Sequence, residues 1–374
     1  MKVIYVIESL SKLGGAENSL INLVIEMKKL GHNSMIVYLW GPNDFHKQLE
    51  SYGIKSHSLE MKSRWSIIQG FWRLHKILSS SDVRLINAQN FFPMFYVALS
   101  KLSIRGKKRI VTYHNMGYEV YPANNPVKLI RKLIDIFLNN FFFDGYLGVS
   151  NAVSESYERH LCINKINTIE NMIPVESIKK IVTSKTNPRN IHEGYKIIMA
   201  GRLVHEKGYK YMVKAAEILK AGNFRFHLSI YGDGPLKSEI ENDILSKKLS
   251  NFISIFSAVG HYELFSAIKG ADLFVMSSIS EGFPMAPAEA MVLGTPVIAT
   301  LVGGIPELIE DGVSGILLPP KDSILLADSI KITLNDLNLR KKLTINGKNR
   351  IEDKFTPTKI CNKLLSYYSE VLKK

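Results

Sequence analysis

Cysteine is nearly absent from this sequence of 374 residues, which holds only Cys162 and Cys361. Neither has a second cysteine or a histidine at metal-site spacing, so a disulfide framework and a zinc site are not expected. No apolar run approaches the roughly 20 residues that a membrane-spanning helix needs. Residues 1–7 are typical of a β-strand, and no small-residue cleavage site follows them. The sequence therefore predicts a protein that remains in the cytoplasm.

Acidic residues are also in deficit, with 34 Asp and Glu against 48 Lys and Arg and a formal net charge of +14. Residues 1–185 hold 24 basic and 14 acidic residues, whereas residues 186–374 hold 24 and 20. Basic side chains gather at 101–109 (KLSIRGKKR) and 128–132 (KLIRK), beside the apolar FFPMFYVAL and IDIFLNNFFF. Such a surface suits an anionic membrane or a lipid phosphate, and solvated helix faces are the alternative. No zinc-finger, RNP or helix-turn-helix signature supports nucleic acid as a partner.

The length and the 46% hydrophobic content allow two cores of ordinary domain size. Apolar runs alternate with helical patterns throughout, which predicts parallel α/β domains. The polar, basic stretch after Asn171 indicates a linker. We expect a first domain over 1–170, a linker over 171–195, a second domain over 196–354 and a final helix over 355–374. The expected strands are VIYVIE, SMIVYL, VRLINA, RIVTYH, YLGVS and NTIE, then KIIMAG, FHLSIYG, FISIFS, DLFVMS, TPVIAT and GILL.

Two doubly wound domains in tandem place a ligand in the cleft between them, at the carboxyl ends of their strands. Gly14 and Gly15 follow the first strand and open a helix, where the backbone can approach a phosphate closely. A plain loop is the alternative, and the pair lacks the G-x-G-x-x-G spacing of a dinucleotide site. His114 ends the strand RIVTYH, where an imidazole can orient a substrate hydroxyl or share a proton with it. A satisfied, partly buried histidine is the alternative reading.

Arg202 and Lys207 lie in the loop that follows the strand KIIMA. Two cations on one loop can neutralise a diphosphate and stabilise it as it leaves, although such residues are often only solvated. The next strand is followed by Gly232-Asp233-Gly234-Pro235, which predicts a turn in which Asp233 caps the segment that follows.

Glu281 and Glu289 bracket the segment EGFPMAPAE. A glutamate before a Gly-containing turn lies near the N–H groups that open the next helix, where anionic groups bind. Glu289 is expected on that helix. One carboxylate can lie near a reacting sugar or phosphate, while the other accepts hydrogen bonds from vicinal hydroxyls such as those of a ribose. The segment therefore predicts a sugar-nucleotide site.

The motifs GGAE, GRLVHEKG, GDGP, SEGFPMAPAEAM and GTPVIAT…GGIPELIEDGVSGIL occur in this order along nearly the whole chain. Together they resemble the large family of retaining glycosyltransferases of GT-B fold called family 4, or glycosyltransferase group 1. The resemblance implies two Rossmann-like α/β domains that face a central cleft. It implies an acceptor-binding N-terminal domain, a nucleotide-sugar-binding C-terminal domain and a last helix that crosses back to the N-terminal domain.

The resemblance also implies roles for individual residues. The catalytic residues that it implies are His114, Arg202, Lys207 and Glu281. The donor-binding residues are Gly15, Ala258, Val259, Gly282, Phe283, Pro284, Met285 and Glu289. Arg202 and Lys207 would hold the diphosphate and Glu289 the ribose, while Glu281 and the backbone after it would hold the sugar. Gly15 would contact the phosphates, His114 would lie beside the transferred sugar, and Ala258 and Val259 would contact the base.

The activity implied is retaining hexosyl transfer that needs no metal or cofactor. No D-x-D pair follows a strand, in agreement with cations that replace a metal in stabilising the leaving group. The leaving phosphate would assist the incoming hydroxyl on the same face, so neither Glu281 nor His114 is assigned as nucleophile or base. The expected donor is a UDP-sugar in preference to a GDP-sugar. The expected acceptor is a glycan or polyprenyl-linked hydroxyl in bacterial surface polysaccharide synthesis, at the inner face of the cell membrane.

Three positions depart from the family pattern: Met172 follows Asn171 in place of glycine, Asn115 stands in place of aspartate, and Ser257 in place of glycine. Two alternative functions share the architecture. A nucleotide-sugar 2-epimerase would convert the donor without an acceptor. A non-catalytic nucleotide-sugar-binding subunit would bind the donor without turnover.

Overall fold

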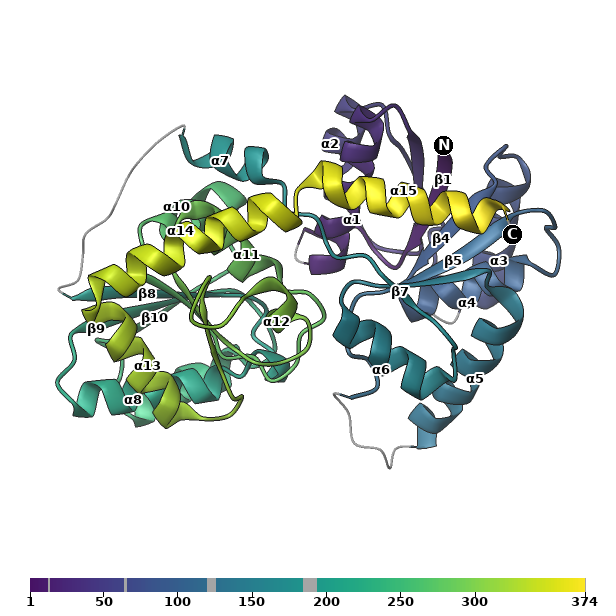
Figure 1. The fold of residues 1–374 in the computed structure, drawn as a ribbon. Coiled ribbons are helices and arrows are strands. Elements are labelled where there is room, and N and C mark those ends of the chain that lie inside the picture. The colour runs from purple at the N-terminus through teal and green to yellow at the C-terminus, as the bar shows by residue number, and fades with distance from the viewer. Residues whose placement is uncertain (13, 64–65, 120–125, 184–193, 374) are drawn as a thin grey trace. The chain divides into compact units, whose positions relative to one another are not determined.

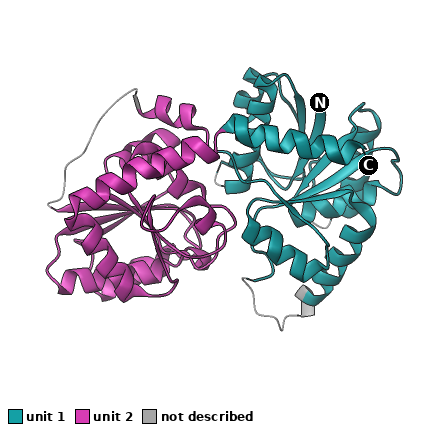
Figure 2. Ribbon diagram, in the orientation of Figure 1, with its two compact units in different colours: residues 1–172, 357–374 teal, residues 173–356 magenta. Residues whose placement is uncertain are grey.

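The structure is a computed structural model that describes all residues except 13, 64–65, 120–125, 184–193 and 374. The chain divides into two compact units, one of residues 1–172 with 357–374 and one of residues 173–356 (Figure 2). Each unit is a parallel β-sheet with helices packed on it (Figure 1). No helix in the described part of the chain is long and apolar enough to cross a membrane.

The first unit contains a seven-stranded sheet with the order β3-β2-β1-β4-β5-β6-β7. Its strands are β1 (Lys2–Ile7), β2 (Asn33–Tyr38), β3 (Lys55–Ser58), β4 (Leu85–Gln89), β5 (Lys108–Tyr113), β6 (Gly145–Gly148) and β7 (Asn167–Thr168). Its helices are α1 (Gly15–Lys29), α2 (His46–Ser51), α3 (Ile67–Ser79), α4 (Phe91–Ser100), α5 (Pro126–Phe142), α6 (Asn151–Leu161) and α15 (Pro357–Lys373).

Helices cover this sheet, so its central strands are buried along nearly their whole length rather than on one face only. All five residues of β4 are buried, including the polar Asn87 and Gln89. The final helix α15 belongs to the same core, because Leu364 and Tyr368 are buried in one cluster with Tyr5 of β1. The C-terminal residues therefore complete the core that the N-terminal residues begin.

The second unit contains a six-stranded sheet with the order β10-β9-β8-β11-β12-β13. Its strands are β8 (Tyr195–Ala200), β9 (Phe226–Tyr231), β10 (Ile253–Phe256), β11 (Leu273–Met276), β12 (Val297–Thr300) and β13 (Ile316–Leu318). Its helices are α7 (Val175–Thr183), the 3-10 turn η1 (His205–Lys207), α8 (Tyr209–Ala221), α9 (Lys237–Ser246), α10 (His261–Lys269), α11 (Met285–Leu293), α12 (Ile305–Leu308), α13 (Ser323–Asn335) and α14 (Leu337–Lys354).

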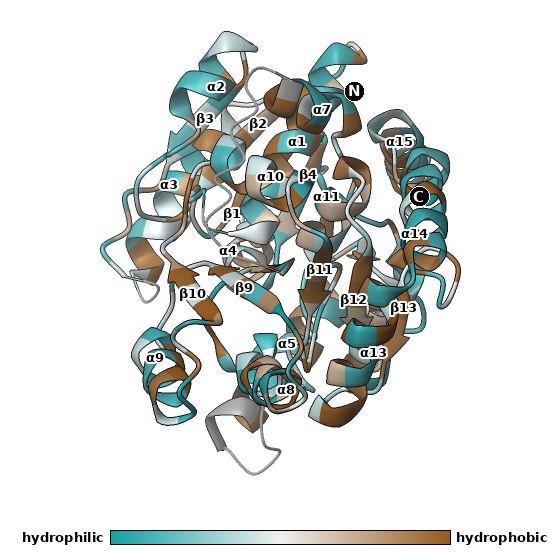
Figure 3. Cartoon of the chain, turned by 90° about the vertical axis from the view of Figure 1, so that its left-hand side faces the viewer, coloured by the Kyte–Doolittle hydropathy of each residue, from teal (hydrophilic) through white to brown (hydrophobic). Residues whose placement is uncertain are grey.

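The strand order of the second unit reverses direction between β8 and β11. This is the topological switch point of a Rossmann sheet, where the loops after the two strands diverge and leave room for a ligand. Strands β11, β12 and β13 are mostly hydrophobic, whereas α14 is largely hydrophilic on its outer side (Figure 3). The unit thus has a buried sheet and a polar surface, with its ligand edge set by topology.

Two segments differ from the expectations of the sequence. The stretch 171–195, expected as a linker, contains helix α7, which packs on α10 and α11 within the second unit. Val175, Ile178 and Val182 lie on one side of α7 and are buried, which is the helical spacing of an apolar face. Strand β3 was not expected, because its sequence KSHS is polar and its side chains are exposed or half-buried at the sheet edge.

Candidate functional site

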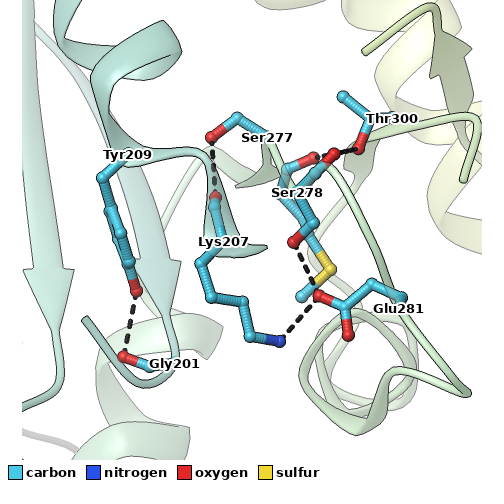
Figure 4. Close-up of polar contacts among 8 residues, drawn as sticks. Gly201, Lys207, Tyr209, Ser277, Ser278, Glu281 and Thr300 are labelled. Atoms are coloured by element: carbon cyan, nitrogen blue, oxygen red, sulfur yellow. Dashed lines mark hydrogen bonds and ion pairs between the residues drawn. The ribbon is translucent and has the colours of Figure 1, made fainter. Parts of the chain in front are cut away.

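An ion pair joins the two loops that flank the switch point of the second unit. Lys207 Nζ, from the loop after β8, lies 2.6 Å from Oε1 of Glu281, from the loop after β11 (Figure 4). Ser278 Oγ donates to the same carboxylate oxygen at 2.6 Å, and Thr300 Oγ1 donates to the carbonyl oxygen of Ser278 at 2.5 Å. The side chains of Lys207 and Glu281 are 22% and 10% exposed. The pair is therefore largely shielded from water, which strengthens it and orients both groups.

Backbone contacts hold the same two loops against each other. Gly208 has a φ of +63°, and a Cβ at this position would overlap the carbonyl oxygen of Ser277. Ser277 Oγ donates to the carbonyl oxygen of Gly208 at 3.1 Å, and the Ile279 N–H donates to that of Glu206 at 2.8 Å. Only glycine permits this approach, since it has no Cβ and tolerates positive φ. The distance between Lys207 and Glu281 is thus set by the backbone as well as by their charges.

A third loop, after β12, encloses Glu281 from another side. Gly303 has a φ of +51°, and a Cβ there would overlap the carbonyl oxygen of Glu281. The next residue, Gly304, donates its N–H to the carbonyl oxygen of Gly282 at 3.1 Å. The Gly303-Gly304 pair therefore fixes the path of the backbone through Glu281 and Gly282.

Arg202 lies on the same loop as Lys207, but its side chain is exposed and makes no hydrogen bond or ion pair with any described residue. The backbone beside it is held, because the Tyr209 hydroxyl donates to the carbonyl oxygen of Gly201 at 2.9 Å (Figure 4). The loop therefore presents one cation that is already positioned by a carboxylate and one that is available to an anion.

Residues Gly282 to Met285 lead into helix α11, whose N-cap is Pro284. The first N–H groups of a helix lack intrahelical partners and attract negative charge. Phe283 is buried and packs against Phe355, with ring centroids 5.4 Å apart. The Phe283 side chain therefore anchors the turn in the core.

Glu289 lies on α11 and is half-buried, with no hydrogen bond or ion pair to a described residue. Burial raises the pKa of its carboxyl to about 7, because a charge is poorly solvated among apolar neighbours. An unpaired, partly buried carboxylate costs folding free energy. Such a cost is common where a group is kept for a ligand.

We predict that Glu289→Gln stabilises the protein in a pH-dependent way. With a pKa of about 7 folded and 4.5 unfolded, Glu289 contributes nothing below pH 4.5. As pH rises from 4.5 to 7 the unfolded chain ionises first, so stability falls, and above pH 7 the loss reaches about 3 kcal/mol. The variant should match the wild type at pH 4 and exceed it at pH 8 in chemical denaturation. Glu241→Gln, at an exposed position on α9, is the control and should show no such gain.

The loop after β10 carries Ala258 and Val259. The Ala258 N–H donates to Oδ2 of Asp233 at 2.7 Å, and Lys237 Nζ donates to Ser257 Oγ at 3.1 Å. The expectation that Asp233 caps the segment after it was wrong, since helix α9 has no side-chain cap. Because β9 and β10 are adjacent and parallel, the Asp233 carboxylate reaches the neighbouring loop instead and holds its backbone.

Gly15 opens helix α1 of the first unit and is exposed. A Cβ at Gly15 would meet no atom within 4 Å, whereas one at Gly14 would overlap the carboxylate of Glu17. Packing within the described residues therefore does not require glycine at position 15. Close approach of a ligand to the backbone is a physical reason for it.

His114 follows β5 and is held from two sides. The backbone N–H of His114 donates to Oδ1 of Asn90 at 3.0 Å, and the imidazole Nε2 lies 2.6 Å from Oε1 of Gln89. The Nδ1 atom is buried and has no hydrogen-bond partner among the described residues. Burial lowers the pKa of His114 to about 4. The imidazole is neutral near pH 7, which favours orientation of a hydroxyl over proton sharing.

The basic segment 101–109 is not the charged surface that the sequence suggested. Arg109 is 1% exposed and donates to the carbonyl oxygens of Lys107 and Ile104, each at 2.8 Å. Lys107 Nζ in turn donates to backbone carbonyls of a neighbouring loop. These cations are satisfied by backbone oxygens inside the fold, so the surface charge of this segment is smaller than its composition implies.

Sequence reasoning missed several polar residues of these sites. Ser277 and Ser278 directly follow the apolar run LFVM, which is the same signal that identified Arg202, and Gly303-Gly304 repeats the pattern after VIAT. Gln89 gave the same signal, because it directly follows the expected strand VRLINA and is the last residue of β4. Among the described residues, no three His, Cys, Asp or Glu side chains come together as metal ligands would.

Comparison with known proteins gives a family match for each half of the chain. Residues 183–350 match the family model of glycosyl transferases group 1, and residues 13–177 match that of glycosyltransferase family 4. An uncharacterized glycosyltransferase of Methanocaldococcus jannaschii is 26% identical over 96% of this chain and 95% of its own length. The capsular polysaccharide biosynthesis glycosyltransferase CapM of Staphylococcus aureus is 27% identical over 49% of this chain and 48% of its own. Alpha-D-kanosaminyltransferase of Streptomyces kanamyceticus is likewise matched over only 45% of its length, with 29% identity over 47% of this chain.

The structure of the Anabaena protein HepE in complex with UDP has a TM-score of 0.80 to this chain, with 19% identity and coverage of 99% of this chain and 100% of that one. Two Rossmann-like parallel-sheet units with these matches define a glycosyltransferase of the GT-B fold. The chain belongs to the group 1, family 4 type of these glycosyltransferases.

Proposed function

We propose that this protein is a retaining, metal-independent glycosyltransferase that moves a hexose from a nucleotide sugar to a hydroxyl group. The observation that carries the proposal is the shielded Lys207–Glu281 pair at the switch point, with the unpaired Arg202 on the same loop. The proposed donor is a UDP-sugar in preference to a GDP-sugar, supported by the UDP bound to the Anabaena protein of the same fold. The proposed acceptor is a glycan or polyprenyl-linked hydroxyl in bacterial surface polysaccharide synthesis, as the name of the staphylococcal relative suggests.

The two cations would stabilise the leaving diphosphate. As the bond from the anomeric carbon to the phosphate oxygen breaks, negative charge grows on that oxygen, and preorganised cations lower the energy of this state. Glu281 holds Lys207 through Oε1, so the lysine does not reorganise when the donor binds. Oε2 of Glu281 makes no hydrogen bond or ion pair with a described residue and is the atom that we assign to a sugar hydroxyl.

The acceptor hydroxyl would attack the anomeric carbon from the face that the phosphate leaves. Its oxygen forms the new glycosidic bond, and its proton passes to the departing phosphate oxygen, so configuration is retained without an enzymatic base. This agrees with the state of the two candidate bases. Oε1 of Glu281 accepts from Lys207 and Ser278, Oε2 is assigned to the donor sugar, and His114 is neutral and bound to Gln89.

The remaining donor contacts are proposed from their positions at the carboxyl edges of the strands. Glu289 would accept hydrogen bonds from the ribose hydroxyls, and Ala258 and Val259 would contact the base. The backbone from Gly282 to Met285 would hold the sugar, with its N–H groups directed as at any helix N-terminus. Gly15 would contact the phosphates, and His114 would orient a hydroxyl of the transferred sugar.

The function is tested with purified protein, membrane extract as a source of acceptor, and a panel of UDP-, GDP- and ADP-sugars. We expect release of UDP that depends on the extract and persists in excess EDTA, and a product with the anomeric configuration of the donor by NMR. Failure to release nucleotide from any donor would refute the proposal. Conversion of the donor without the extract would indicate an epimerase, and donor binding without turnover would indicate a non-catalytic subunit.

We further propose that the first unit docks on the inner face of the cell membrane through helix α5. Ile130, Leu133, Phe137 and Phe141 are 59%, 58%, 55% and 66% exposed and recur at helical spacing along one face. The exposed Arg131 lies on the same helix. An exposed apolar stripe of this length, with an exposed arginine on the same helix, matches an interfacial helix on anionic lipid.

The double variant Phe137→Glu, Phe141→Glu tests this docking. Each phenylalanine that leaves the lipid interface forfeits about 1.5 kcal/mol or more, so affinity for vesicles with 30% phosphatidylglycerol should fall at least about tenfold in co-sedimentation. Ile345→Glu is the control, because Ile345 is also exposed but lies on α14 of the second unit. Equal binding by the double variant and the wild type would contradict the proposal.

A further inference from the structure

A continuous chain of hydrogen bonds runs from His114 into the interior of the first unit. His114 Nε2 lies 2.6 Å from Gln89 Oε1, and Gln89 Nε2 donates to Asn87 Oδ1 at 2.8 Å. Asn87 Nδ2 then donates to the hydroxyl of Tyr368 on helix α15 at 2.7 Å. Asn87, Gln89 and Tyr368 are almost fully buried. The chain therefore connects the edge of the sheet with the C-terminal helix.

Beyond Tyr368 the chain of hydrogen bonds continues to a group that can accept a hydrogen bond but cannot donate one. The Tyr368 hydroxyl donates to that of Tyr5 at 3.3 Å, and the Tyr5 hydroxyl donates to Sδ of Met27 at 3.0 Å. A thioether has no hydrogen to donate, whereas a hydroxyl has one and an amide has a donor end and an acceptor end. Met27 is fully buried on α1, so no water replaces it.

The acceptor at this end sets the direction of every bond in the chain. Because the hydrogen of Tyr5 is used on Met27, the Tyr5 oxygen accepts from Tyr368, whose own oxygen must accept from the amide nitrogen of Asn87. Asn87 Oδ1 then faces Gln89 and accepts from its amide nitrogen. This leaves Gln89 Oε1 toward His114, where it accepts from Nε2–H.

Thr112 supports the same direction from the side. Its Oγ1 donates to Asn87 Oδ1 at 2.9 Å, so the carbonyl oxygen of Asn87 accepts two hydrogen bonds and its nitrogen faces Tyr368. Buried chains of this kind polarise along one direction and resist reversal, because turning one amide breaks the bonds on both sides of it.

We propose that helix α15, through Tyr368, Asn87 and Gln89, holds His114 as the Nε2–H tautomer and so reserves Nδ1 as a hydrogen-bond acceptor. The three residues are positioning residues, since they act through His114. Nδ1 is buried without a partner, and His114 lines a cavity of ≈ 40 Å³ in this unit, enough for a hydroxyl or a water. That this acceptor receives a hydroxyl of the transferred sugar rests on the proposed function, whereas the tautomer does not.

The test measures the tautomer of His114 directly. Protein labelled with ¹⁵N in its ten histidines is examined by NMR through the long-range coupling of imidazole nitrogens to ring protons at pH 7.5, and His114→Gln assigns the signals of His114. We expect the Nε2–H form in the wild type. Tyr368→Phe removes the acceptor of Asn87 Nδ2 and leaves Thr112 as the side chain that still orients this amide. The amides then turn more readily, and the His114 nitrogen signals should shift toward a mixture of tautomers. Its kcat should fall roughly tenfold, with the donor KM within about twofold.

Tyr367→Phe is the matched control. It removes a buried hydroxyl from the neighbouring position of the same helix. That hydroxyl bonds the backbone of Tyr146 and the side chain of Asn167, and no hydrogen bond among the described residues joins it to the chain that ends at His114. It should leave the His114 signals and kcat unchanged. If Tyr368→Phe does not fold, Gln89→Leu removes the acceptor next to His114 and should change its tautomer.

Three results would overturn the proposal. These are a wild-type His114 in the Nδ1–H form, His114 signals unchanged by Tyr368→Phe, or equal effects of Tyr368→Phe and Tyr367→Phe. Because the spectra need no substrate, a correct tautomer in a protein that turns over no nucleotide sugar would refute the proposed function alone.

Discussion

Replacing Lys207 with alanine should lower turnover by about a hundredfold or more, the usual effect of removing one group that stabilises growing negative charge. The variant also leaves Glu281 with Ser278 as its one remaining partner among the described side chains, so the carboxylate loses the ion pair that positions it. Steady-state release of nucleotide measures the change. We expect the loss mainly in kcat, because the interaction is strongest in the transition state.

Two further variants make this prediction specific. Arg202→Ala should lower turnover by tenfold or more with little change in stability, since the Arg202 side chain is exposed and makes no hydrogen bond or ion pair with a described residue. Lys210→Ala removes an exposed lysine three positions beyond Lys207, at the start of α8, and should leave turnover unchanged. Wild-type turnover in Lys207→Ala or Arg202→Ala would refute their assignment to the leaving group.

Gly303→Ala should weaken donor binding without changing any side chain of the site. The new Cβ would overlap the carbonyl oxygen of Glu281 and so displace the backbone that carries Glu281 and Gly282. A shift of about 1 Å in a reacting geometry costs roughly a hundredfold in rate. The substitution also places alanine at a φ of +51°, which costs about 1–2 kcal/mol of stability.

Gly312→Ala separates these two effects. Gly312 has a φ of +67°, so alanine suffers a similar backbone cost, but its Cβ would meet no atom within 4 Å. We expect thermal unfolding to show a loss of about 1–2 kcal/mol in this control and a further loss of about 1–3 kcal/mol for Gly303→Ala from the overlap. Calorimetric titration with UDP should show weakened binding in Gly303→Ala alone. Equal binding by both variants would mean that the Gly303 contact does not shape the site.

The positions of the candidate residues along the chain could be predicted because parallel strands leave a simple pattern. Each buried strand is a short apolar run, and glycine, serine or charged residues follow it at the carboxyl edge, as Gly201 to Lys207 follow YKIIMA. Helix α7 could have been predicted from its pattern of apolar residues. Its buried Val175, Ile178 and Val182 have helical spacing, but they lie in a polar stretch that was interpreted as a linker.

The burial and the bonding partners of a charged side chain were harder to predict, because the sequence shows that a residue is charged but not which group it bonds. Arg109 belongs to a basic cluster yet lies inside the first unit, where backbone carbonyls satisfy its guanidinium. Asp233 was expected to cap its own segment and instead holds the neighbouring loop at Ala258. In both cases the alternatives differ by which loops lie side by side, and local propensity carries no information on that.

By itself, the sequence determined the alternation of strands and helices, the motifs at the strand ends and the likeness to group 1 glycosyltransferases, since all of these are local patterns of residue type. Only the tertiary structure decided which of those residues meet. Lys207 reaches Glu281 across 74 positions because β8 and β11 become neighbours where the strand order reverses. The Tyr368 hydroxyl reaches Asn87 across 281 positions because α15 packs into the core of the first unit. Such pairings follow from sheet order and helix packing, which are set by the folding of the whole chain.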